Sequence, residues 1–183
     1  MAEELDKPFS ADVLCLGPPG SGKTLLLKTL QDQNAVDNTT TSGPTTGMTL
    51  RKIVLPQGGN LTICEVGGGM APLWHHYYRG INRIIFVVDA SNLCQISAAG
   101  VLLYSLLAEP CLQSAKVLLV LSKMDASYRQ MRNEALLMLH MKKLQEQAFQ
   151  EITILEASSY SNEGISEIQA WLTGPKKKSE RGK

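Results

Sequence analysis

The chain has 183 residues and a mass of 20.0 kDa, a length that fits one domain with a single buried core. Hydrophobic residues make up 44% of the chain and charged residues 19%, which excludes disorder of the whole protein. The formal net charge of +1 gives no sign of a nucleic-acid-binding protein. The last ten residues hold five basic and one acidic side chain, a balance of +4, so the first 173 residues sum to −3. We therefore expect an N-terminal extension (1–10), one folded domain (11–173) and a basic, disordered tail (174–183).

Membrane attachment is not expected from the sequence. The longest apolar runs, 84–88 and 117–121, have five residues each, whereas a membrane-spanning helix needs about 20. Ala2 stands where myristoylation requires glycine, and no cysteine near the C-terminus is available for prenylation. We expect a monomeric cytoplasmic protein that has no stable membrane anchor and whose tail makes at most a weak contact with anionic lipid.

Short apolar runs alternate with longer stretches of helical period, a pattern typical of βα units around a mostly parallel sheet. The sequence predicts strands, in chain order, at 13–16, 50–55, 61–65, 84–89, 117–121 and 151–155. It predicts helices at 23–33, shortly after 72, at 95–108, from an N-cap at Ser127 to about 147, and at 164–172. The polar segment 34–47 is expected to be a long loop, and the turn 56–59 to close a hairpin. In the fourth helix, a core-facing stripe is expected from Met131, Ala135, Met138 and Leu139.

A phosphate-binding loop is predicted at 17–24, where Gly-Pro-Pro-Gly-Ser-Gly-Lys-Thr matches the pattern G-x-x-x-x-G-K-[ST] between a strand and a helix. Backbone N–H groups at the helix N-terminus are expected to surround a phosphate; they belong to Gly20, Ser21, Gly22, Lys23 and Thr24. The Lys23 side chain is expected to reach the β- and γ-phosphates, and the Thr24 hydroxyl to ligate Mg²⁺. The loop indicates a nucleotide-binding protein without identifying the base, since an ATPase or a nucleotide kinase would carry the same motif.

The base is indicated by Ser122-Lys123-Met124-Asp125, which directly follows a predicted buried strand. That position is the carboxyl edge of the sheet, where open α/β proteins bind ligands. The Asp125 carboxylate can accept hydrogen bonds from both N1–H and N2–H₂ of guanine, whereas adenine offers no such pair of donors. The alkyl chain of Lys123 can lie across the ring. GTP and GDP are therefore the expected ligands.

These motifs resemble those of the Ras-like small GTPases, and within them the Arf-like branch. Glu65-Val66-Gly67-Gly68 is similar to the D-x-G-G of that branch, and the sequence P-L-W-H-H-Y-Y at 72–78 to its P-L-W-x-H-Y-[FY]. The run 84–91 is similar to the strand that follows there, and Glu156-Ala157-Ser158-Ser159 to the base-binding E-x-S-A loop. The resemblance extends from about residue 12 to residue 172. It implies a six-stranded, mostly parallel sheet with one antiparallel strand and helices on both faces.

The resemblance also implies roles for individual residues. Guanine would be bound by Ser122, Lys123, Asp125, Ser158 and Ser159. The Gly68 N–H would bind the γ-phosphate, and Mg²⁺ would be held by Thr24, by Thr45 or its neighbour Thr46, and through water by Glu65. The segments 34–47 (switch I) and 67–78 (switch II) would change order with the nucleotide and contact an effector protein. Of switch II, we expect Trp74 and Tyr77 either to form an exposed aromatic patch or, for one of them, to pack in the core.

Three positions depart from the family pattern. Ser122 replaces the usual Asn, Glu65 the usual Asp, and Gly69 the Gln that orients the attacking water. Without that Gln we expect slow or partner-dependent GTP hydrolysis, and no catalytic residue is assigned. His75 and His76 are weighed as substitutes, although an exposed or helix-packed pair is the simpler interpretation. The alternatives are a scaffold that binds nucleotide weakly and, less favoured, a P-loop ATPase or phosphotransferase, for which no acidic pair is recognised.

Overall fold

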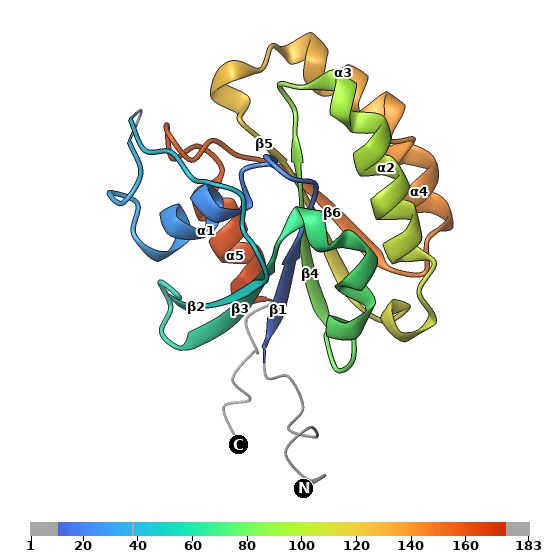
Figure 1. Ribbon diagram of the computed structural model, residues 1–183, viewed down its shortest axis with the longest axis horizontal. Helices are drawn as coiled ribbons and strands as arrows, with labels where there is room; N and C mark the ends of the chain where they lie inside the picture. The colour runs from blue at the N-terminus through green and yellow to red at the C-terminus, as the bar shows by residue number, and fades with distance from the viewer. Residues whose placement is uncertain (1–10, 38, 175–183) are drawn as a thin grey trace, which may run out of the picture.

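A six-stranded sheet forms the centre of the protein, in the order β2-β3-β1-β4-β5-β6 (Figure 1). The computed structural model describes residues 11–37 and 39–174, so the N-terminal extension and nearly all of the basic tail lie outside the described residues. All neighbouring strands are parallel except β2 and β3, which form an antiparallel hairpin. This confirms the predicted fold class. The strands are β1 (Val13–Leu16), β2 (Met48–Val54), β3 (Asn60–Val66), β4 (Arg83–Asp89), β5 (Lys116–Ser122) and β6 (Glu151–Glu156).

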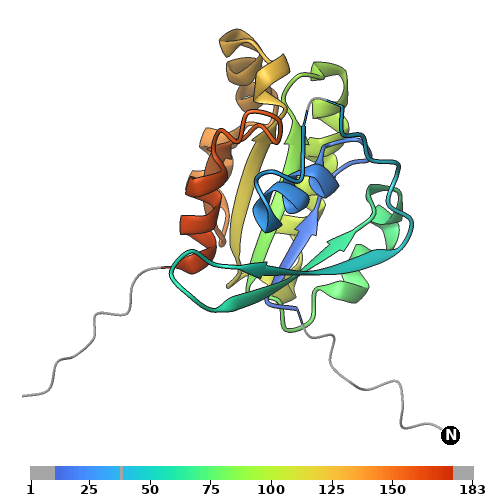
Figure 2. The ribbon, with the colours of Figure 1, turned by 90° about the vertical axis from the view of Figure 1, so that its left-hand side faces the viewer.

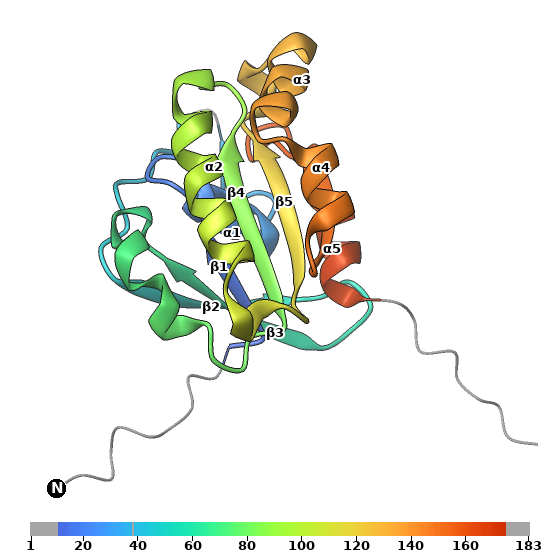
Figure 3. The same cartoon turned by 90° about the vertical axis from the view of Figure 1, so that its right-hand side faces the viewer.

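The inner strands are apolar along most of their length because helices cover both faces of the sheet. One face carries α1 (Lys23–Gln31) and α5 (Ile165–Thr173), which lie side by side in Figure 2. The other face carries the remaining helices, seen in front of the sheet in Figure 3, and the 3₁₀ segment η1 of switch II. Their bounds are α2 (Leu93–Leu107), α3 (Arg129–Met138), α4 (Met141–Gln147) and η1 (Gly68–Tyr77), with short 3₁₀ turns η2 (Pro110–Leu112) and η3 (Met124–Ala126).

The prediction of one helix from Ser127 to about residue 147 is wrong. The chain breaks between α3 and α4 at His140, which adopts a left-handed backbone conformation with φ 50°. Ser127 does not cap a helix, because the residue before α3 is Tyr128 and the Ser127 hydroxyl donates to the Ala90 carbonyl at 3.3 Å. Met138 is the last residue of α3 and is 42% exposed, so it is not part of the predicted core stripe.

None of the helices in the described part of the chain combines the length and the hydropathy of a membrane-spanning segment. The edge strand β2 shows the alternation of a half-buried strand, since Ile53 is buried while its neighbours Lys52 and Val54 are exposed. The β2–β3 hairpin lies between the two switch segments in the sequence. It therefore connects switch I to switch II through a single pair of strands.

Candidate functional site

A cavity of about 360 Å³ opens at the carboxyl ends of the parallel strands. Its walls come from segments that are far apart in the sequence: the phosphate-binding loop, switch I, the start of switch II, Lys123 after β5 and Tyr160 after β6. These strand ends point upward in Figure 1. The predicted phosphate, metal and base segments are thus brought to one edge of the sheet, as expected for a parallel α/β fold.

The phosphate-binding loop is a tight turn between β1 and α1. Gly17 cannot be replaced without movement, because a Cβ atom there would lie 2.2 Å from the Val87 carbonyl oxygen. Gly22 has a left-handed φ of 88° directly before α1. Predicted loop residues that line the cavity are Gly20, Gly22, Lys23 and Thr24, whereas Ser21 is buried beside it. The loop therefore brings the N-terminus of α1 to the cavity wall, where backbone N–H groups favour an anion.

The Lys23 ammonium group is held by backbone oxygens of its own loop. Its Nζ donates to the carbonyls of Gly17 and Pro18, both at 2.9 Å, and the residue is only 5% exposed. Burial lowers the pKa of Lys23 from its ordinary value, while Cys15 and Glu65 act in the opposite direction. The ammonium group is therefore positioned rigidly at the wall of the cavity.

Three oxygen-bearing side chains meet beside this cavity: Thr24 and Thr45, which line it, and the fully buried Glu65, which contacts both. The two hydroxyl oxygens are 3.0 Å apart, and both donate to Oε1 of Glu65, with 3.2 Å for the bond from Thr45. Hydroxyl and carboxylate oxygens are the donors that Mg²⁺ prefers, so this set fits the predicted metal. Thr45 makes these contacts, whereas Thr46, the alternative weighed from the sequence, is exposed.

Arg51 of β2 was not recognised as a site residue. Its Nε lies 3.4 Å from Oε2 of the fully buried Glu65, and it donates from Nη1 to Gln31 Oε1 at 3.2 Å. The guanidinium group therefore occupies the side of the carboxylate that faces away from the two threonines. The only signal in the sequence was its spacing: Arg51 and the buried Ile53 are two positions apart in a strand, so both side chains lie on the same face of β2.

Ser122 ties the base-binding segment to the phosphate-binding loop in place of the usual Asn. Its hydroxyl lies 2.6 Å from the Ser21 carbonyl oxygen and 3.0 Å from that of Val88. Lys123, with a left-handed φ of 58°, donates to Asp89 Oδ2 at 2.6 Å. Although the serine hydroxyl is shorter than an asparagine amide, Ser122 thus still contacts the phosphate-binding loop.

We expect Ser122→Ala to weaken guanine-nucleotide binding about tenfold and to lower the melting temperature. The change removes the one hydrogen that the buried Ser122 hydroxyl shares between the Ser21 and Val88 carbonyls, a loss of about 1–3 kcal/mol. Thermal denaturation and nucleotide titration measure the two effects. Ser105→Ala is the matched control, because the exposed Ser105 hydroxyl also donates to a carbonyl, that of Val101 at 2.9 Å. Equal effects of both substitutions would contradict a linking role for Ser122.

The remaining predicted base contacts lie in the base loop, residues 157–164 between β6 and α5. The buried Ser158 donates from its hydroxyl to Asp125 Oδ1 at 2.6 Å, so the two predicted guanine-binding segments are in direct contact. Ser159 is half-buried, and its carbonyl accepts a hydrogen bond from Thr29 of α1 at 3.4 Å. The Asp125 side chain is exposed at the 3₁₀ turn η3.

Switch II begins with three glycines in different surroundings. A Cβ atom at Gly67 would lie 2.2 Å from the Thr45 carbonyl oxygen, and one at Gly68 would lie 2.3 Å from the Pro19 nitrogen. Gly69 has no heavy atom within 4 Å of its Cβ position. Gly67 and Gly68 thus bring switch II into backbone contact with switch I and the phosphate-binding loop. Gly69 lines the cavity, with open space where a side chain would begin.

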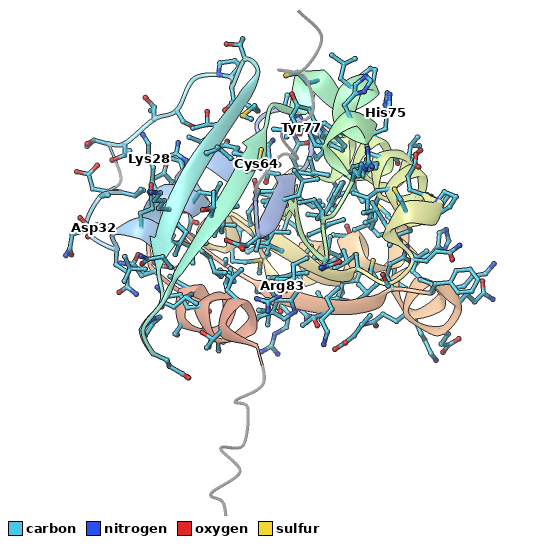
Figure 4. The ribbon with its side chains drawn as sticks, turned by 90° about the horizontal axis from the view of Figure 1, so that it is seen from below. Lys28, Asp32, Cys64, His75, Tyr77 and Arg83 are labelled. Carbon is cyan, nitrogen blue, oxygen red and sulfur yellow. The ribbon has the colours of Figure 1, made fainter. Side chains whose placement is uncertain are left out.

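Trp74 packs in the core, so it is not part of an exposed aromatic patch. It is 2% exposed, meets Phe86 edge-on with ring centroids 6.2 Å apart, and donates from Nε1 to the Gly67 carbonyl at 3.2 Å. Tyr77 is partly buried against the same cluster. His75 and His76 are exposed, with their rings tilted by 40° and their centroids 4.0 Å apart, and Figure 4 shows His75 at the periphery, pointing outward. The cavity lining found among the described residues includes neither histidine.

Comparison with known proteins identifies the family. A model of the ADP-ribosylation factor (Arf) family matches residues 3–175. The chain belongs to the Arf family. Human ADP-ribosylation factor-like protein 16 is 36% identical over 165 residues, which cover 87% of this chain and 83% of that protein. ADP-ribosylation factor-like protein 1 of Saccharomyces cerevisiae is 30% identical over 162 residues, 87% of this chain and 84% of the yeast protein.

Solved structures share the fold. The Arl6 BBS3 small GTPase of Trypanosoma brucei, with a bound GppNp, superposes with a TM-score of 0.72 at 22% identity, over 89% of this chain and 95% of that one. The mammalian SRP receptor gives a TM-score of 0.67 at 18% identity, over 88% and 97%. With Arf-family membership, the protein is a GTP-binding switch of the Arf-like type. Neither the scaffold nor the ATPase alternative is favoured by these relatives.

Proposed function

We propose that this Arf-family switch holds a guanine nucleotide and Mg²⁺ in the cavity described above, and that it hydrolyses GTP slowly unless a partner protein assists. The observation that carries the proposal is the meeting of Thr24, Thr45 and Glu65 beside the phosphate-binding loop. One of these residues comes from the loop, one from switch I and one from the end of β3. A group bound there would contact both the phosphates and a switch.

The phosphate end of the cavity supplies positive charge locally. Backbone N–H groups from Gly20 to Thr24 and the Lys23 ammonium group would bind the β- and γ-phosphates. Thr24 and Thr45 would hold Mg²⁺ directly and Glu65 through water, and the metal would neutralise phosphate charge. Arg51, whose Nε lies 3.4 Å from Oε2 of Glu65, places a positive charge beside this fully buried carboxyl group.

The base end would read guanine through Asp125. The hydrogen bond from Ser158 orients this carboxylate by occupying one lone pair of Oδ1, and the exposed remainder of the group is free to accept from N1–H and N2–H₂. Ser122 and Ser159 would position the two segments, and the Lys123 alkyl chain would cover the ring. The acidic side chain therefore supplies the specificity that the phosphate-binding loop lacks.

Nucleotide sensing would depend on the contact between the switches. Gly67 donates from its N–H to the Gly47 carbonyl at 2.9 Å, and it packs on the Thr45 carbonyl. In the proposal, the γ-phosphate binds the Gly68 N–H and Thr45 binds the metal, so loss of that phosphate releases both segments. An effector protein would recognise switch I (34–47) and switch II (67–78) in the ordered state. We propose that the protein acts as a monomer in the cytoplasm.

Titration of the purified protein with GTP, GDP and ATP, with and without Mg²⁺, tests this function. We expect both guanine nucleotides to bind at least 100-fold more tightly than ATP, and EDTA to weaken their binding. Lys23→Ala is expected to lower the affinity for GTP by on the order of 100-fold, because it removes a buried charge-assisted contact to phosphate. Preference for ATP would favour a phosphotransferase, and absence of binding would favour the scaffold.

A further inference from the structure

The base loop is built rigidly at both ends. At its start, the Ser158 N–H donates to the Glu163 carbonyl at 3.0 Å, which closes the loop on itself. At its end, Gly164 has a left-handed φ of 77°, and a Cβ atom there would lie 1.8 Å from the Glu156 carbonyl oxygen. The residues between these points are therefore held in a fixed position relative to the sheet.

Two side chains of this rigid loop reach across to the switch I region. The Tyr160 hydroxyl donates to the Thr40 carbonyl at 3.1 Å, and the Asn162 amide donates from Nδ2 to the Gln33 carbonyl at 3.3 Å. Both acceptors are backbone oxygens more than 100 residues away in the chain. The rigid loop thus holds switch I near both its start and its middle.

Tyr160 also forms part of the cavity itself. The half-buried side chain lines the same cavity as Lys123 and the switch I residues from Thr41 to Thr45. Tyr160 belongs to the same loop as Ser158, whose hydroxyl donates to Asp125 at 2.6 Å, so the tyrosine follows directly on the predicted base contacts. An aromatic ring at that place offers an apolar surface to a nucleoside.

We propose that Tyr160 slows the release of the bound nucleotide in two ways: its ring covers the nucleoside, and its hydroxyl, by donating to the Thr40 carbonyl, holds switch I over the cavity. We call this pair of contacts the Tyr160 latch. The latch rests on the proposed binding of guanine nucleotide in this cavity. It assigns to the base loop a second task besides contacting guanine, namely restraining a switch segment. Asn162 adds a second contact of the same kind, because its amide donates to the Gln33 carbonyl directly before switch I.

Release of a fluorescent GDP analogue, followed after addition of excess unlabelled GDP, tests the latch. We expect Tyr160→Phe to accelerate release about threefold to tenfold, since it keeps the ring and removes one hydrogen bond. Tyr160→Ala removes the ring as well and is expected to accelerate release further, beyond about tenfold. Hydrogen exchange of residues 34–47 in the GDP-bound protein is expected to be faster in Tyr160→Phe than in the wild type.

Tyr104→Phe is the matched control, because the Tyr104 hydroxyl also donates to a carbonyl, that of Leu139 at 2.9 Å, on the helical face away from the cavity. This control is expected to release nucleotide at the wild-type rate. Release from Tyr160→Phe at that rate, with unchanged exchange of switch I, would overturn the latch. A wild-type protein that retains no guanine nucleotide at all would instead overturn the proposed function.

Discussion

Asp125→Asn is expected to exchange guanine for xanthine as the preferred base. The substitution removes the charge that accepts N1–H and N2–H₂ of guanine, a loss of about 3 kcal/mol or on the order of 100-fold in affinity for GDP. Xanthine carries an oxygen in place of the N2 amino group, so the asparagine amide can donate to it. The hydrogen bond from Ser158 survives, because asparagine retains the acceptor oxygen. Competition between GDP and xanthosine diphosphate for the purified variant measures the exchange.

Asp32→Asn is the control for this experiment. Asp32 also accepts a hydrogen bond through Oδ1, from the Asn34 N–H at 2.9 Å, but on an exposed turn after α1. This variant is expected to keep the preference for GDP. If Asp125→Asn kept the preference as well, the base would have to be recognised by another group, and the assignment of the base end of the cavity would fail.

Gly69→Gln is expected to raise the rate of GTP hydrolysis in a single turnover by about tenfold or more. A glutamine amide near the γ-phosphate would orient the attacking water, and correct placement of the reacting groups lowers the barrier to reaction. The fold leaves room for it, since no heavy atom lies within 4 Å of the Cβ position and Gly69 is not among the glycines with positive φ. Wild-type protein is expected to turn over slowly under the same conditions.

Gly69→Ala separates the two effects of this substitution. Alanine adds the Cβ atom without an amide, so it is expected to hydrolyse GTP as slowly as the wild type and to bind it equally well. Comparable acceleration by alanine and glutamine would show that backbone stiffening, and not the amide, limits the rate. Fast hydrolysis by the wild type without any partner would mean that another group performs the work of the missing Gln.

The sequence predicted those parts of the fold and site that depend on local patterns. Buried strands such as β4 and β5 are recognised because helices on both faces leave them continuously apolar. The phosphate-binding motif predicted the place of Thr24, whereas Glu65 and Thr45, with Thr46 as its alternative, were expected only from the resemblance to the Arf-like branch. The functional roles of these residues stay predictions.

Features that depend on contacts between distant segments were missed. Arg51 and Tyr160 belong to no motif, and their partners are fixed only by the register of β2 and by the path of the base loop. The break at His140 was missed because a left-handed conformation at a residue other than glycine has no sequence signal in this chain. Trp74 was left undecided, since the sequence did not show that its indole N–H would find the Gly67 carbonyl.

The contact between Tyr160 and Thr40 has a consequence for the order in which the protein can assemble during synthesis. The phosphate-binding loop is complete by Thr24, but the wall of its cavity closes only with Tyr160 near the end of the domain. Helix α5, which follows, packs in the same apolar cluster as α1. A nascent chain lacking this last part therefore has the phosphate-binding loop and Asp125 without the base loop that contacts both Asp125 and α1. The cavity wall is therefore complete only when the last strand and helix join the elements made first.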